Sequence, residues 1–200
     1  GGETSKSVRF DNHGEGGRHR VSDFNTNGDC AAGTGAFLDQ QAGRLQFRIE
    51  DTGQIASTAR RTAQIAGRCS VFAKSDMVHA QQRGFSPEEI LKGLCEAVAR
   101  NFKSSITRGR SLERDVAFVG GVAANGEVGR ALERAFGWEP GTLLVPPEHA
   151  SFGAIGAALL ASDRGRSSVI QGSPLALAGQ APGSHRFERA PALSLENVLL

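Results

Sequence analysis

The sequence predicts an α/β protein, and three observations carry that prediction. Residues 115–162 run as strand, glycine turn, helix, strand and helix, an order that builds parallel strand pairs. Residues 85–106 repeat an apolar residue every four positions, which is typical of a helix with one buried face. The chain has 26 glycines in 200 residues, and many of them stand where these elements join. Glycines at such junctions serve sharp turns or a close approach of the backbone to a ligand.

The first part of the chain predicts a hairpin and three helices. Two alternating segments, 7–10 and 20–24, flank a glycine-rich turn at 12–17, and this pattern favours a β-hairpin. The helices expected next are one after Gly35 with Phe37, Leu38, Ala42 and Leu45 on one face, one over 54–65, and one capped by Ser75 or Asp76.

The following helix has the clearest start signals in the sequence. Ser86 stands at the N-cap, Pro87 takes the first helical position, and Glu89 completes a capping box. Phe85 and Ile90 occupy the positions of a hydrophobic staple. The helix is expected to end at Gly109, and its apolar face comprises Ile90, Leu94, Val98, Phe102 and Ile106.

The last elements alternate between strand and helix. Residues 115–119 predict a buried strand that runs into a glycine pair, and a helix is expected over about 125–136. A second strand at 143–145 stops at two prolines. A helix of small residues then covers 151–162, after which Gly, Ser and Pro replace the periodic pattern.

Length and composition bound the function. The chain offers one domain over 1–163, followed over 164–200 by a linker and a C-terminal extension. A net charge of +2, with no basic run among aromatic residues, gives no sign of a nucleic-acid partner. Three cysteines, an odd number, argue against a disulfide framework and favour the reducing cytoplasm. No apolar stretch approaches the length of a membrane-spanning helix.

Two of the cysteines stand in segments that favour metal binding. Cys30 opens the string C-A-A-G-T-G, and both Cys30 and Cys69 lie in helix-breaking segments just ahead of a helical pattern. Thiolates at helix N-termini suit a metal cluster, because the positive end of the helix dipole stabilises negative charge. The alternative is that a free cysteine is a small buried hydrophobe, and this is the expectation for Cys95 within the apolar helix.

Two glycine motifs indicate a bound nucleotide. Residues 1–6 (G-G-E-T-S-K) precede the first strand, and such a turn can bring backbone N–H groups to a phosphate, with Lys6 as a neighbouring cation. Residues 118–125 (F-V-G-G-V-A-A-N) end a strand in two glycines, which leaves room for a flat ring. Each motif has a plainer alternative, a hairpin turn for the first and a helix-capping role for Asn125 in the second. Neither is a P-loop or a dinucleotide fingerprint.

In this order the motifs resemble those of one ATPase family, the activators of 2-hydroxyacyl-CoA dehydratases and the related benzoyl-CoA reductase ATPase subunits of the BadF/BadG/BcrA/BcrD type. The resemblance runs from residue 1 to about 162 and includes P-P-E at 146–148 and G-A-I-G-A-A at 153–158. It implies half of a ribonuclease H-like, actin-like ATPase, in which a mixed sheet with flanking helices carries a helical cluster-binding insertion.

The resemblance also implies ligands and site residues. It implies ATP or ADP with Mg²⁺ at the glycine motifs and a [4Fe–4S] cluster at the cysteines, and it assigns no catalytic side chain. Glu3 and Thr4 depart from the Gln and Asp usual in the family, and the chain starts inside the first motif, so we expect a fragment without a complete ATP cleft. The implied cofactor-binding residues are Gly1, Gly2, Ser5, Lys6, Gly120, Gly121 and Asn125, and the implied metal ligands are Cys30 and Cys69.

The cluster sets the expected assembly. A [4Fe–4S] cluster takes four thiolates and the chain offers two, so a homodimer or a pair of ATPase units would share one cluster. The function implied is ATP-driven transfer of one electron to a CoA-ester dehydratase or reductase. Two other functions stay open, a kinase-like ATPase of the same superfamily without a cluster and a non-catalytic scaffold module of a larger activase.

Overall fold

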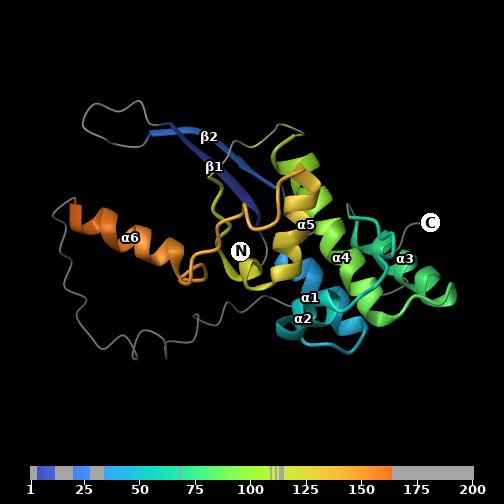
Figure 1. The fold of residues 1–200 in the computed structure, drawn as a ribbon. Coiled ribbons are helices and arrows are strands. Elements are labelled where there is room, and N and C mark those ends of the chain that lie inside the picture. Colours follow the sequence, from blue (N-terminus) through green and yellow to red (C-terminus); the bar gives the residue numbers. More distant parts are fainter. Residues whose placement is uncertain are drawn as a thin grey trace, which may run out of the picture. The chain divides into compact units, whose positions relative to one another are not determined.

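The computed structural model describes residues 4–11, 20–27, 34–67, 69–108, 110, 112 and 115–163 (Figure 1). The chain divides into two compact units, 1–157 and 158–200. The expected linker and extension beyond residue 163, the hairpin turn at 12–17 and the helix stop at Gly109 lie outside the described residues.

The hairpin expected at the start of the chain is present. Strand β1 (Lys6–Asp11) pairs antiparallel with β2 (Arg20–Thr26), and the register shifts between Arg9 and Phe10. The pairing sets Val8 opposite Phe24, and both of these side chains are about half exposed to solvent, at 44% and 54%. The hairpin therefore presents apolar side chains to water.

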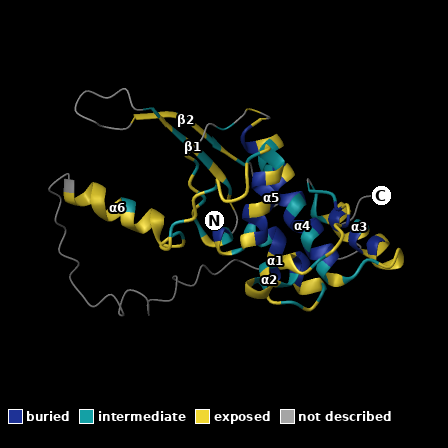
Figure 2. Cartoon of the chain, viewed as in Figure 1, coloured by how far each residue is buried: buried dark blue, intermediate teal, exposed yellow. Residues whose placement is uncertain are grey.

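Helices form the rest of the described fold, and α4 is the centre of the core. Buried residues gather on α1, α4 and α5, and α4 lies against both of the other two helices (Figure 2). The bounds of these elements are α1 Gly35–Arg44, η1 Ile49–Asp51, α2 Thr52–Ser57, α3 Ser70–Gln82, α4 Pro87–Asn101, a π-helical turn η2 Phe102–Ile106, η3 Gly121–Ala124, α5 Gly126–Phe136 and α6 Phe152–Asp163.

The start signals of α4 are confirmed. Pro87 is the first helical residue, and the backbone N–H of Ser86 donates to Glu89 Oε2 at 3.1 Å, as a capping box requires. Ile90 and Leu94 have no exposed surface, so the face that repeats every four residues is the core face. Cys95 is 1% exposed on the same helix, which confirms the core position expected for it.

The second helix is shorter and earlier than the sequence predicts. The helix expected over 54–65 is α2, which begins at Thr52 and ends at Ser57. Two hydroxyl groups at the end of the helix donate to its backbone carbonyls. The Ser57 hydroxyl donates to Gln54 at 2.6 Å, and the Thr58 hydroxyl donates to Ile55 at 2.8 Å. Local hydroxyl groups thus end the helix by bonding to its own backbone.

The segment after α2 is extended and fastened to α4. The N–H of Ala63 donates to the carbonyl of Glu89 at 3.1 Å, and Arg100 donates to the carbonyl of Ile65 at 2.8 Å. Two glycines make this approach possible. A Cβ at Gly67 would lie 2.5 Å from the Ala97 carbonyl oxygen, and one at Gly93 would overlap the Ala63 carbonyl oxygen.

The start of the third helix is also corrected. Helix α3 begins at Ser70, and Cys69 is its N-cap with an extended backbone (φ −138°, ψ 126°). Asp76, expected as a possible cap, lies inside the helix and accepts the N–H of Ala66 at 2.7 Å. Its carboxylate is used to hold the extended segment rather than to begin a helix.

The strand expected at 115–119 is not buried. Ala117 forms one parallel bridge with Leu144, supported by Phe118 N–H to the Leu144 carbonyl at 2.8 Å. Val119 is 37% exposed and Leu144 is 61% exposed. Within the described residues these segments pair only with each other, so their side chains remain open to solvent.

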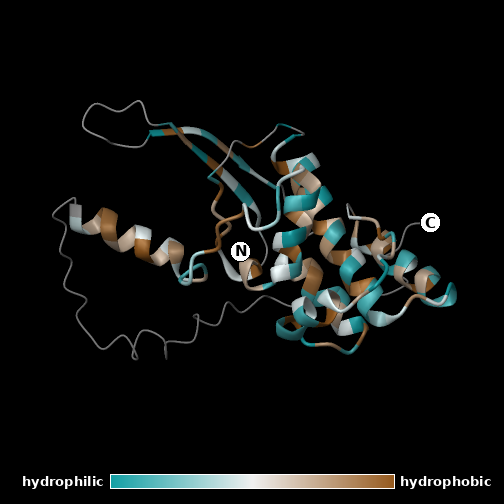
Figure 3. Cartoon of the chain, viewed as in Figure 1, coloured by the Kyte–Doolittle hydropathy of each residue, from teal (hydrophilic) through white to brown (hydrophobic). Residues whose placement is uncertain are grey.

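Helix α6 is apolar along most of its length (Figure 3). Phe152 and Ile155 are 47% and 41% exposed. A helix that is apolar all round is typical of a buried position in a larger assembly of elements. None of the described helices is both long enough and apolar enough to cross a bilayer.

Candidate nucleotide and metal sites

The Gly120–Gly121 turn is fixed from outside by His149. The N–H of Gly120 donates to the His149 carbonyl at 2.7 Å, and His149 Nδ1 lies 3.0 Å from the Gly120 carbonyl, which it meets as the donor. Gly120 has φ 103°, a left-handed value that favours glycine. His149 belongs to none of the motifs that predict the site, and its only signal in the sequence is its place directly after the P-P-E string.

Gly121 borders open space. Among the described residues, no atom beyond its chain neighbours lies within 4 Å of the position that a Cβ would take there, and the residue is exposed. The first glycine of the turn is therefore held by hydrogen bonds, and the second borders open space. That space leaves room for a flat ring beside the backbone.

Asn125 caps the helix that follows this turn. Its side-chain oxygen accepts the N–H of Glu127 at 3.1 Å and the N–H of Val128 at 3.2 Å. Its amide nitrogen donates to the hydroxyl of Thr52 at 3.0 Å. The capping role considered for Asn125 is thus present, and both polar ends of its side chain have protein partners.

An ion-pair network stabilises the first turn of α5. The Glu127 side chain is 3% exposed, and its two oxygens meet Arg130 at 2.8 Å and Arg134 at 2.7 Å. Arg134 also reaches Glu96 on α4 at 2.7 Å.

Burial, and then the Glu127 charge, raise the pKa of the Cys95 thiol to about 12, so Cys95 stays protonated in the core.

The first glycine motif is described only in part, because Gly1 and Gly2 lie outside the described residues. The Ser5 N–H donates to Asn27 Oδ1 at 2.8 Å, and the Asn27 N–H donates to the Ser5 carbonyl at 3.1 Å. These bonds tie the end of the motif to the end of β2. Lys6, the first residue of β1, is exposed.

Cys69 is the one proposed metal ligand that the structure describes, since Cys30 lies outside those residues. Its side chain is half-buried at the N-terminus of α3. Two exposed apolar side chains follow it, Val71 at 66% and Phe72 at 65%. Over the described ranges, no three His, Cys, Asp or Glu side chains gather as a metal site.

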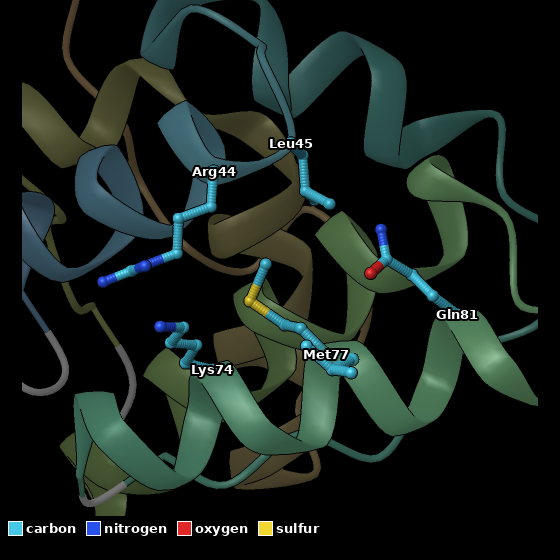
Figure 4. A pocket seen from close by; sticks show the side chains of 6 residues that line it. Arg44, Leu45, Lys74, Met77 and Gln81 are labelled. Carbon is cyan, nitrogen blue, oxygen red and sulfur yellow. The ribbon is translucent and has the colours of Figure 1, made fainter.

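A hollow of about 280 Å³ lies between the end of α1 and the face of α3 (Figure 4). Met77 reaches into it between the two helices, and the charged ends of Arg44 and Lys74 extend to one side of it. The residues that line it are Arg44, Leu45, Lys74, Met77, Val78 and Gln81. Its lining carries positive charge and no carboxylate.

The fold is that of the actin-like ATPases, as solved structures of two activators show. The activator of the 2-hydroxyisocaproyl-CoA dehydratase from Clostridium difficile, with bound ADPNP, aligns with a TM-score of 0.71 and 32% identity over 84% of this chain and 62% of its own. Component A of the Acidaminococcus fermentans (R)-2-hydroxyglutaryl-CoA dehydratase aligns with a TM-score of 0.71 and 31% identity, covering 82% of this chain and 59% of its own.

The chain belongs to the BadF/BadG/BcrA/BcrD ATPase family, whose model matches residues 1–161. The 2-hydroxyisocaproyl-CoA dehydratase activator of Clostridioides difficile is 34% identical over 168 residues, which is 84% of this chain and 60% of the relative. The activator of lactoyl-CoA dehydratase of Anaerotignum propionicum is 35% identical over 161 residues, 80% of this chain and 59% of the relative. The chain thus spans about three fifths of these relatives, and the resemblance seen in the motifs is confirmed.

Proposed function

We propose that this chain is part of an ATP-dependent activator that passes one electron to a CoA-ester dehydratase or a benzoyl-CoA reductase-type enzyme. The observation that carries the proposal is the turn at Gly120 and Gly121, locked by His149 on one side and open on the other. Family membership and the names of the relatives, activators of CoA-ester dehydratases, support it. The ADPNP bound to a structural neighbour supports a nucleotide as the ligand.

In this proposal the nucleotide is ATP or ADP with Mg²⁺. Gly120 and Gly121 border the adenosine, and Asn125 positions the turn through the cap it forms. The first motif would contribute the backbone N–H groups that precede Ser5, since the Ser5 N–H already donates to Asn27, and Lys6 would supply a cation nearby. The residues assigned to the phosphates are Gly1, Gly2, Ser5 and Lys6. The rest of the cleft would come from the part of the relatives' length that this chain does not span.

The metal site in the proposal is a [4Fe–4S] cluster, which supplies a one-electron carrier. Two thiolates per chain fit a cluster shared by two copies or two paired ATPase units. Cys30 and Cys69 are its ligands, and the position of Cys69 at a helix N-terminus favours an anionic group there. Val71 and Phe72, exposed in the first turn of α3, would be covered when the second copy adds its own pair.

The same proposal extends to organisation and setting. Residues 1–163 form the ATPase half, and residues 164–200 form a linker and an extension. The protein acts in the cytoplasm, where a reducing environment keeps the thiols available. No nucleic acid or membrane takes part.

Anaerobic reconstitution of the full-length protein with iron and sulfide tests the cluster. We expect four irons per two chains, the visible absorbance of a cluster, and a dimer by light scattering. Cys69→Ser and Cys30→Ser should each abolish iron retention, whereas Cys95→Ala, the matched control in the core, should retain it.

The outcomes separate the proposal from its alternatives. A protein that binds ATP yet retains no iron is a kinase-like ATPase of the same superfamily. A protein that binds neither is a scaffold module. A protein that retains iron and hydrolyses ATP, but reduces no CoA-ester dehydratase, would contradict the partner.

A further inference from the structure

The Thr52 hydroxyl joins two parts of the chain that are distant in sequence. Thr52 is 1% exposed, and its hydroxyl donates to the Ile49 carbonyl at 2.7 Å and accepts from Asn125 Nδ2 at 3.0 Å. A hydroxyl has a single proton to donate, and here it is donated to the carbonyl of Ile49. The amide nitrogen of Asn125 must therefore be the donor in the second bond, which leaves its oxygen facing the α5 backbone.

The neighbouring glycine makes the contact close. A Cβ on Gly53 would lie 2.7 Å from Asn125 Oδ1 and 3.0 Å from Asn125 Cγ. Any side chain at this position would push Asn125 away from the first turn of α5. The Thr52–Gly53 backbone is thus seated directly against the cap of the helix that follows the glycine turn.

The other end of this contact leads to α1. The Ile49 carbonyl, which accepts the hydrogen bond from Thr52, belongs to the 3₁₀ turn η1. This turn contacts α1. Helix α1 begins at Gly35, five residues after Cys30. A displacement of Asn125 would therefore be transmitted through Thr52 to the helix that follows the first proposed cluster ligand.

We propose that Thr52 is a positioning residue that couples the glycine turn at 120–125 to η1 and α1, and through the contact of α1 with α3 to Cys69 at the start of α3. The inference rests on the proposed function, in which that turn holds the nucleotide. In this role Thr52 acts through Asn125, its hydrogen-bond partner. It fixes the orientation of the Asn125 amide and links any movement of the turn to η1 and α1, because buried hydrogen bonds are costly to leave unmade.

The test compares Thr52→Val with Thr52→Ser in the full-length protein. Valine keeps the shape and removes the hydroxyl, whereas serine keeps the hydroxyl. Three quantities are measured: the melting temperature, the Kd of ADPNP, and the rate at which a thiol reagent modifies Cys69 with and without ADPNP. We expect Thr52→Val to weaken ADPNP binding about tenfold and to abolish the effect of the nucleotide on Cys69. Thr52→Ser should restore both.

A second variant keeps the test independent of folding. Asn125→Asp retains a strong helix cap and replaces the amide donor to Thr52 by an acceptor, which can only compete with the Ile49 carbonyl for the single Thr52 hydroxyl proton. It should lose the effect of ADPNP on Cys69 while its melting temperature stays near that of the wild type. If both variants melt early yet keep the nucleotide effect, Thr52 is merely structural and the inference fails. If the wild type binds no ADPNP at all, the proposed function fails first and the inference with it.

Discussion

Arg61 holds Glu89 with two parallel hydrogen bonds. Arg61 Nε lies 2.8 Å from Glu89 Oε1, and Nη2 lies 2.9 Å from Oε2. Glu89 also accepts the Ser86 N–H in the capping box, so one carboxylate both begins α4 and fastens the extended segment after α2. The hydrogen bond from Arg61 is the largest cause that lowers the pKa of Glu89 below its ordinary value.

This pair predicts a pH dependence of stability. Because the folded-state pKa of Glu89 is lowered, its contribution is complete above the ordinary glutamate pKa and is lost as pH falls through the folded value. Urea unfolding between about pH 7 and pH 3 should show the wild type losing stability faster than Glu89→Gln does. Parallel curves for the two proteins would show that Glu89 titrates normally.

Gly93 predicts a large effect of a single methyl group. A Cβ there would overlap the Ala63 carbonyl oxygen, so Gly93→Ala must displace the extended segment from α4. Overpacking of this kind costs about 1–3 kcal/mol. Gly43→Ala is the control, since no atom of the described part of the chain crowds its Cβ position on α1 within 4 Å. That control should gain about 0.5–1 kcal/mol in urea unfolding, because alanine favours a helix interior.

The hydrogen bond from His149 to Gly120 predicts that substituting His149 weakens both the stability of the protein and nucleotide binding at the glycine turn. His149→Ala removes the side-chain donor to the Gly120 carbonyl and should cost about 1 kcal/mol of stability, measured by urea unfolding. The Kd of ADPNP should rise as well, because the turn loses one of its two supports. His149→Asn, which keeps a donor, should retain more of both. An unchanged Kd in His149→Ala would place the nucleotide elsewhere.

The two described cysteines predict opposite reactivity. Cys95 is buried with its pKa raised to about 12, so a thiol reagent should reach it only after unfolding. Cys69 is half-buried at the start of α3 and should react in the folded protein without cluster. Peptide mass mapping after brief labelling gives both rates in one sample. Rapid labelling of Cys95 under native conditions would mean that α4 opens locally.

Features that depend on residues close together in the chain could be predicted from the sequence. The start of α4 follows from Ser86, Pro87 and Glu89, which act on one another within a single turn. The family and the actin-like fold followed from motif strings and their order. The start of α3 was missed because Cys69 caps it without a favoured capping side chain, while Asp76, a good capping residue, bonds to Ala66 instead.

Contacts between distant segments could not be predicted in this way. Thr52 lies 73 residues from Asn125, and His149 lies 29 residues from Gly120. Neither pair has a local pattern, since each depends on how whole elements meet. The burial expected for 115–119 failed for the same reason, because a strand is buried only by the elements beside it.

Glu127, with one oxygen for Arg130 and the other for Arg134, has a consequence for mutational tolerance. Losing either arginine alone leaves the carboxylate one cation, whereas losing both leaves a buried charge without any. The two positions should therefore show strong epistasis, with single substitutions surviving a growth selection that the double substitution fails. A library of single variants would score both arginines as dispensable and miss the requirement they share.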